Sequence, residues 1–331
     1  MKNAMMSVAE TTQKIKQGAV LLLAGSEKAL SQLPKGKWIG GTSVYFVTET
    51  GGRVDHDNIY VTEIEAATNA RAVIYQGEDL PNLTMNRFDG GLTMFLIPAF
   101  STAHSDFAIH GAEYSGLFDQ PLMGWITGIH LDDLGKATPK VFDGATGTMH
   151  EDGAAVLHVA LDGGKAAELD ILNLFEQDDD ADVITFASTG FSATRAMVNG
   201  AEVDFAAYVK DKGIDTQLPL VADYAGAMIN VSFQSVSDER IDFYAPVVAG
   251  VEYRLAKSPG AYADVFAARA TGDGGNALSC NCILNYLYGE LEGKTTGSFT
   301  GPATFGEIAY VLLNQTLVKL DIHAAEASAV A

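Results

Sequence analysis

Short runs of apolar residues, some alternating with polar ones, recur along the whole chain and are bounded by Gly, Pro and Asn. Runs of this length with a period of two are typical of strands, and few long stripes at helical spacing lie between them. The clearest alternation places Ile229, Val231 and Phe233 on one face, and it continues at 241–245 and 251–255. We therefore predict a sheet-rich protein in which these three segments form an antiparallel meander.

The rest of the pattern divides into two sheet-rich halves. The further predicted strands span 19–24, 38–48, 72–75, 92–97, 155–161, 168–175, 183–188, 277–284 and 311–322. The predicted helices span part of 8–16, then 202–212, 262–269 and 287–291. The third of them follows Ser258-Pro259, a pair typical of a helix cap and first turn. The expected fold class is α/β, leaning towards α+β, with mostly antiparallel strands and flanking helices.

Composition supports a globular chain with one internal boundary. With 331 residues, 47% of them hydrophobic and 19% charged, the chain can bury a sizeable core without a metal or a disulfide. The acidic run EQDDDAD at 176–182 cannot share an interior without counter-charges, which marks it as a linker. The predicted organisation is an N-terminal segment at 1–16, a first half at 17–175, the linker at 176–182, a second half at 183–322 and a loose tail at 323–331.

The net charge and the cysteine content limit which binding partners and which cellular compartment are expected. A formal net charge of -21 repels phosphate backbones and anionic membrane surfaces, so we expect neither nucleic acid nor a membrane as a partner. No apolar run approaches the roughly 20 residues that cross a bilayer, and the first 17 residues lack the features of a secretory signal. The two cysteines, Cys280 and Cys282, lie too close together to form a disulfide framework. The expected location is the cytoplasm.

One stretch near the C-terminus matches a known signature. The segment SFTGPATFGEIA at 298–309, followed by LNQTL at 313–317, is similar to the C-terminal signature of the FIST family of bacterial sensory domains. An apolar strand ending in Cys precedes that signature in the family, and LSCNC at 278–282 stands in its place here. Near the front, WIGGTS at 38–43 resembles an element of the N-terminal FIST half, without its Cys or its Gly-Glu-Ile portion.

The FIST resemblance implies a two-part sensory module that binds small molecules such as amino acids. It also implies that a subset of members is associated with haem and nitric oxide signalling. The sequence contains no recognisable kinase, cyclase or chemotaxis transducer region. A sensor of this kind would therefore act through a separate signalling partner.

Two short motifs are candidate ligand contacts. The Gly40-Gly41-Thr42-Ser43 motif offers free backbone amides and two hydroxyls to an anionic group, or forms a glycine bulge in a strand. Glu307, beside an aromatic residue and a glycine, could receive a ligand ammonium, or cap the segment that follows. Other aromatic residues would form the walls of the site. The candidate ligand-binding residues are Gly41, Thr42, Ser43, Tyr253, Phe299, Phe305, Gly306 and Glu307.

The cysteines and one histidine are candidates for other chemistry. On a strand, Cys280 and Cys282 would share one face, where they could act as a redox pair, a nucleophile or part of a metal site. A structural zinc site needs four ligands and the sequence supplies no second pair, so buried free thiols are the more common state. His130, beside Asp132, is a candidate haem ligand, although a surface or hydrogen-bonded histidine is far more common.

The sequence therefore favours a non-enzymatic small-ligand sensor with no predicted cofactor. A haem-based nitric oxide sensor and a cysteine-dependent enzyme remain alternatives. A structural or self-assembling protein is a further alternative, because exposed strand edges would permit a homo-oligomer.

Overall fold

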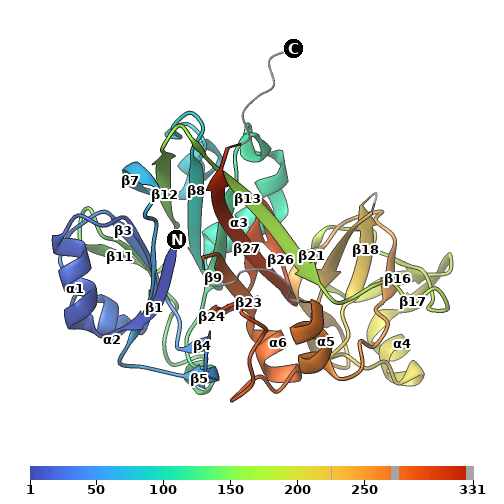
Figure 1. Ribbon diagram of the computed structural model, residues 1–331. Helices are drawn as coiled ribbons and strands as arrows, with labels where there is room; N and C mark the ends of the chain where they lie inside the picture. Colours follow the sequence, from blue (N-terminus) through green and yellow to red (C-terminus); the bar gives the residue numbers. More distant parts are fainter. Residues whose placement is uncertain (225, 270–275, 326–331) are drawn as a thin grey trace, which may run out of the picture.

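The computed structural model describes residues 1–224, 226–269 and 276–325. Strands make up 44% and helices 19% of the chain, and most strand pairs are antiparallel, which confirms the α/β class predicted from the sequence. Figure 1 places the first sheet, with α1 and α2, on one side of the molecule and the sheet beside α4 on the other. The strands β8, β12, β13 and β27 lie between them.

Five sheets organise the strands. The N-terminal sheet has the order β1 (Lys2–Met6), β6 (Ile59–Glu63), β2 (Leu21–Gly25), β3 (Trp38–Thr42), β10 (Val141–Asp143), β11 (Thr148–His150). The central sheet has the order β26 (Val311–Leu313), β25 (Glu307–Ala309), β9 (Leu122–Thr127), β8 (Leu92–Pro98), β12 (Ala154–Leu161), β7 (Ala67–Tyr75). The mixed sheet has the order β13 (Lys165–Asn173), β27 (Thr316–Ala324), β23 (Leu278–Cys282), β24 (Gly301–Thr304), β4 (Tyr45–Thr48), β5 (Gly51–Val54).

The other two sheets lie within residues 184–255. The outer sheet has the order β17 (Ala201–Asp204), β16 (Arg195–Val198), β14 (Ile184–Thr185), β22 (Tyr253–Leu255), β18 (Leu220–Tyr224), β19 (Ala227–Val231). The small sheet has the order β15 (Gly190–Ala193), β21 (Ile241–Val247), β20 (Phe233–Val236). The α-helices are α1 (Val8–Lys16), α2 (Glu27–Leu30), α3 (Thr102–His110), α4 (Phe205–Lys212), α5 (Tyr262–Arg269) and α6 (Ile283–Tyr288). The 3₁₀ turns are η1 (Gly77–Asn82), η2 (Gly111–Glu113), η3 (Leu117–Asp119) and η4 (Leu131–Asp133).

The alternation along β8 explains how the layers pack. Leu92, Met94 and Leu96 belong to the core between the central, N-terminal and mixed sheets. Phe95 and Ile97 point to the other face, into the core beneath α3. Because both faces of this strand are covered, its sequence reads as a continuous apolar run.

Three parallel strand pairs in the described ranges are each joined by a helix. They are β2 with β3 through α2, β8 with β9 through α3, and β23 with β24 through α6. The second strands of these units end side by side: the Gly128 amide donates to the Thr42 carbonyl (2.9 Å) and the Phe305 amide to the Ile126 carbonyl (3.0 Å). Ligands in sheets with parallel strands bind beyond the carboxyl ends of the strands. This convergence therefore marks where a site is expected.

Glycine allows β8 and β9 to approach closely. A Cβ on Gly124 of β9 would clash with the backbone carbonyl of Phe95 on β8. We expect Gly124→Ala to lower the free energy of unfolding by about 2 kcal/mol, because backbone must shift to admit the methyl group. Urea unfolding of this variant beside Gly163→Ala, whose added Cβ would have nothing within 4 Å, tests this. Equal midpoints for the two variants would contradict it.

Several predicted elements have other boundaries in the structure. The predicted strand 38–48 divides after Thr42 into β3 and β4, which belong to different sheets. The predicted strand 277–284 ends at Cys282, where α6 begins, and 311–322 divides at Gln315, whose φ is 50°. The first part of the predicted helix 202–212 is the end of β17. Buried apolar runs carry no signal for a bend or a change of sheet, which is why these boundaries were missed.

The predicted meander is only partly correct. β20 pairs with β21 antiparallel, as expected. The predicted strand through Ser232 divides there between two sheets, and its first part, β19, pairs with β18. β22 pairs with β18 and β14 instead of β21. The helices predicted at 8–16 and 262–269 are confirmed, and Ser7 caps the first in a capping box with Glu10.

The last strands of the sequence pair with strands from the first half of the chain. β24 pairs with β4, β25 with β9, and β27 with β13. The acidic run 176–182 joins the mixed sheet to the outer sheet, and Gln177 forms a bridge with Ala256. The domain boundary at this run stays a prediction.

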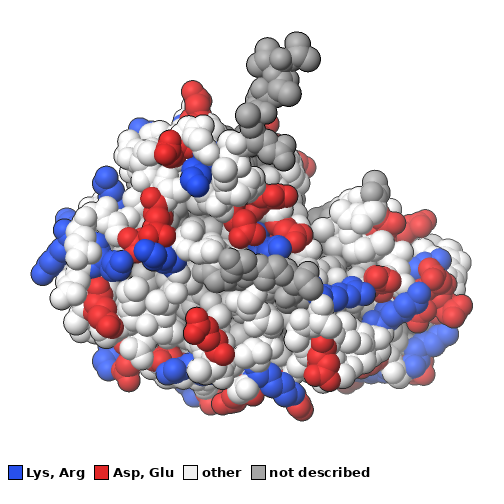
Figure 2. All heavy atoms as spheres, in the orientation of Figure 1, with Lys and Arg blue, Asp and Glu red and all other residues white. Residues whose placement is uncertain are grey.

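Acidic and basic side chains are interspersed over the surface, and the acidic ones are twice as numerous. Figure 2 shows acidic and basic residues interspersed on the face in view, with uncharged surface between them. Many of the cations are paired, as in Lys14 with Glu63 at 2.7 Å. Among the described helices, none combines the length and the apolar character required to span a membrane.

Candidate functional site

The cavity with the more apolar lining, called the main cavity below, has a volume of about 420 Å³ and lies where the central, mixed and small sheets meet. Its walls come from the end of β8, the start of α3, the turn η4, the small sheet and α6. Most of the lining side chains are apolar. The lining residues are Ala99, Phe100, His104, Ser105, Leu131, Leu134, Phe191, Ser192, Gln234, Arg240, Asp242, Phe243, Tyr244, Cys282, Ile283, Leu284, Leu287, Phe305 and Asn314.

Large apolar side chains that line the main cavity are also exposed to solvent. Phe100 is 60% exposed, Leu134 44% and Leu287 40%. Phe100 meets Phe305 edge to face, with 6.2 Å between ring centroids. Exposed apolar residues gathered at the lining of a cavity mark it as a candidate site for an apolar molecule.

Phe100 adopts a strained backbone that shapes this wall. Its φ is 66°, in the left-handed region that a bulky side chain rarely occupies. Ser101 follows and caps α3 by accepting a hydrogen bond from the His104 amide (3.0 Å). The Phe100 amide in turn donates to Nδ1 of His104 at 3.3 Å. The turn between β8 and α3 therefore fixes the orientation of this histidine.

His104 lines the main cavity and carries a hydrogen-bond donor without a partner among the described residues. Because its Nδ1 accepts the Phe100 amide, the neutral ring carries its proton on Nε2. The residue is 8% exposed, and its Nε2 has no hydrogen-bond partner in the part of the chain that the structure describes. Burial lowers the pKa of His104 to about 4, so the ring is neutral near pH 7.

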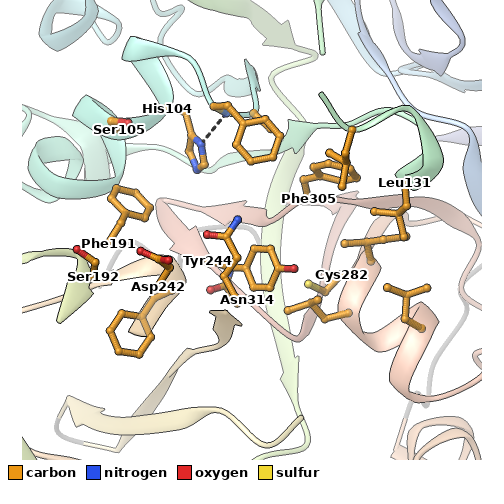
Figure 3. A pocket seen from close by; sticks show the side chains of 18 of the residues that line it. His104, Ser105, Leu131, Phe191, Ser192, Asp242, Tyr244, Cys282, Phe305 and Asn314 are labelled. Atoms are coloured by element: carbon orange, nitrogen blue, oxygen red, sulfur yellow. Dashed lines mark hydrogen bonds between the residues drawn. The ribbon is translucent and has the colours of Figure 1, made fainter. Parts of the chain in front are cut away.

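Asn314 presents an acceptor on the facing wall. Its Nδ2 donates to the Leu313 carbonyl at 3.0 Å, while its buried Oδ1 has no partner among the described residues. Figure 3 shows His104 and Asn314 pointing toward one another across the main cavity. Two buried polar atoms left without partners are costly unless something else satisfies them.

The charged groups of the main cavity are already satisfied. Arg240 forms an ion pair with Asp242 at 3.0 Å. Asp242 also accepts a hydrogen bond from Ser235 at 2.8 Å. Neither group offers an unpaired charge to a ligand.

Glu307 lies behind the wall of the main cavity and does not line it. It is fully buried, and its Oε2 accepts hydrogen bonds from the Thr316 hydroxyl (2.8 Å) and amide (3.2 Å). Burial raises the pKa of Glu307 to about 8, and the contacts with Thr316, Cys282 and Thr304 partly oppose this shift. The neighbouring Gly306 lies within the same wall, and its carbonyl accepts from the Ile126 amide at 2.8 Å.

A second cavity of about 460 Å³ lies at the carboxyl ends of β2, β3 and β9. Thr42, Ser43 and His130 line it, while Gly41 sits against Thr127 in a space too small for a Cβ. His130 stacks on Tyr45, with 5.4 Å between ring centroids. The second cavity therefore gathers the anion-site motif and the candidate haem ligand of the sequence analysis.

The remaining sequence candidates lie in cores away from both cavities. Tyr253 is fully buried in the core of the outer sheet, and its hydroxyl accepts from the Val248 amide at 2.9 Å. Phe299 packs with Leu174, Phe266 and other apolar residues. The structure thus brings Phe305, Glu307 and Cys282 together but places these two aromatic residues elsewhere.

A family model matches residues 6–323 of this chain. The chain belongs to DUF6976, a family of unknown function. The resemblance to the FIST family is therefore wrong, since the DUF6976 match covers nearly the whole chain and the FIST likeness rested on short segments. Searches among curated proteins and among solved structures gave no match.

Sequence reasoning missed the polar pair of this DUF6976 chain. His104 was one of several scattered histidines, and nothing near it formed a motif. The available signal was Ser101-Thr102 directly after an apolar strand, which is typical of a helix start beyond a strand end. Asn314 lies in a turn between two strands that the pattern had merged into one.

Proposed function

We propose that this protein binds a small, neutral, largely apolar molecule in the main cavity. The observation that carries the proposal is the pair His104 Nε2 and Asn314 Oδ1, a donor and an acceptor that face one another without partners among the described residues. A ligand with one acceptor and one donor would satisfy both. The volume of about 420 Å³ is within the range typical of small-molecule sites.

The surroundings favour a neutral ligand over an amino acid. An amino acid would bring an ammonium and a carboxylate, and each would need an opposite charge in this apolar setting. Arg240 and Asp242 already neutralise each other, and Glu307 is behind the wall. A planar lactam, which carries a carbonyl beside an N–H, matches the lining better.

A sensory role remains part of the proposal. A ligand in the main cavity would contact α3, α6 and the small sheet at once. Binding would then favour one packing of these elements, and a separate partner protein could read that change.

Two neutral probes test ligand binding. N-phenyl-1-naphthylamine, which has no carbonyl, should fluoresce on saturable binding, and quinolin-2(1H)-one should displace it. We expect His104→Asn, which keeps an acceptor for the Phe100 amide but removes the Nε2 donor, to weaken quinolinone binding about tenfold and leave the naphthylamine affinity unchanged. His110→Asn, a change at an exposed position of the same helix, serves as the control.

Absence of saturable probe binding would contradict the proposed site. Equal losses for both probes in His104→Asn would also count against it, because a lost hydrogen bond affects only the carbonyl ligand.

A further inference from the structure

Cys282 places a thiol in the wall of the main cavity. Figure 3 places its sulfur beside the hydroxyl of Tyr244, which lines the same cavity. The charge of a Cys282 thiolate would raise the pKa values of Tyr244, Tyr262 and Tyr288. The hydroxyl of Tyr262 is itself buried without a partner within the described ranges.

Backbone and carboxyl groups also converge on this thiol. The amides of Gln315 and Leu284 contact the sulfur and partly oppose the effect of burial, which raises the pKa of the Cys282 thiol. Glu307 lies beside the same sulfur, and its Oε1 has no hydrogen-bond partner of good geometry among the described residues. Hydrogen-bond donors that can stabilise a thiolate and a carboxylate that can accept its proton thus surround one sulfur atom.

Cys280 provides a contrast two residues earlier on β23. It is equally buried, but its sulfur donates to the Gly124 carbonyl at 3.5 Å and belongs to the main hydrophobic core. It does not line the main cavity. The two thiols therefore differ in their position relative to the main cavity and not in how deeply they are buried.

We propose that Cys282 is a covalent binding site for uncharged α,β-unsaturated ketones or aldehydes that enter the main cavity. The proposal rests on the proposed function, because the electrophile must occupy the same cavity. The apolar walls suit such a molecule, and the Tyr244 hydroxyl is placed to donate to its carbonyl oxygen.

The addition balances without an oxidant or a second substrate. The sulfur forms a bond to the β-carbon while the thiol proton moves to the Glu307 carboxylate. The electron pair of the C=C bond moves toward the carbonyl, and the resulting enolate takes a proton at the α-carbon from the protonated Glu307. The net reaction adds S–H across the double bond and restores the carboxylate.

Labelling of the full-length protein with cyclohex-2-enone tests the site. Intact mass and peptide mapping should show one adduct, on Cys282, in the wild type and in Cys280→Ser, and none in Cys282→Ser. Both thiols should react when the protein is unfolded in urea, because neither cysteine forms a disulfide. An adduct on Cys280 at an equal rate, or no adduct on the folded protein, would overturn the proposal.

The pH dependence tests the role of Glu307. The titratable groups that face it are Cys280 and Cys282 from β23 and Tyr262 from α5. Because the carboxylate accepts the proton, the labelling rate should rise about tenfold per pH unit below pH 8 and then level off. Glu307→Gln should lose this rise, and an unchanged profile in that variant would overturn the role of the carboxylate.

The naphthylamine probe separates this inference from the proposed function. If the probe binds but the enone forms no adduct, the covalent site is wrong and the ligand cavity stands. If neither the probe nor the enone binds, both are wrong.

Discussion

Between pH 6.5 and pH 4, the free energy of unfolding should fall by about 3 kcal/mol more in the wild-type protein than in the His104→Asn variant. Burial lowers the pKa of this histidine from 6.5 to about 4, so the unfolded chain binds the proton more tightly than the folded protein. The stability contributed by the neutral ring is therefore complete above pH 6.5 and is lost as the pH falls to 4. The magnitude follows from about 1.4 kcal/mol per unit of pKa.

Urea unfolding at a series of pH values measures this difference. The His104→Asn variant should still keep part of the acid sensitivity, because burial and the nearby Arg87 and Arg71 lower the pKa of His158 to about 4 as well. The control is His110→Asn, which changes an exposed residue of the same helix. Parallel curves for wild type and His104→Asn would show that the His104 ring is not held neutral.

The parts of the fold that the sequence predicted carry local signals. The helix at 8–16 begins with a Ser7 and Glu10 capping box, and α5 combines helical spacing with the preceding Ser-Pro pair. The division of 38–48 at Ser43 carries no such signal, because the residues on both sides are buried and fit a continuing strand. The point at which a chain passes from one sheet to another depends on pairing with strands distant in sequence, and a local pattern of residues does not contain that information.

The candidate site shows the same limit. Phe305, Cys282 and Glu307 were chosen for their chemistry, and the structure places them around one wall of the main cavity. His104 and Asn314 matter because each leaves one polar atom unpaired, and that property appears only when the chain is folded. The FIST likeness failed for a related reason, since it rested on short segments, whereas the DUF6976 match covers residues 6–323.

The largest pH effect is expected from Glu307. Its pKa rises from 4.5 to about 8 because the folded protein buries the carboxyl, so here the folded state binds the proton more tightly than the unfolded chain. Stability is therefore complete below pH 4.5 and falls as the pH rises to 8, by about 5 kcal/mol in all. About 2 kcal/mol of that loss lies above pH 6.5, where the two buried histidines finish losing their protons in the unfolded chain and so oppose the loss by a smaller amount.

Glu307→Gln should abolish that fall, because the amide can still accept the hydrogen bonds from Thr316 but does not ionise. The measurement is the free energy of unfolding in urea at pH 6.5 and pH 8, with Glu78→Gln at an exposed position of η1 as the matched control. We expect the wild type and the control to lose about 2 kcal/mol more over this interval than Glu307→Gln, and the buried histidines, which all three proteins keep, do not contribute to that difference. If all three proteins change equally, the carboxyl ionises as freely in the folded protein as in the unfolded chain, and it would not serve as the proton acceptor for Cys282 near pH 8.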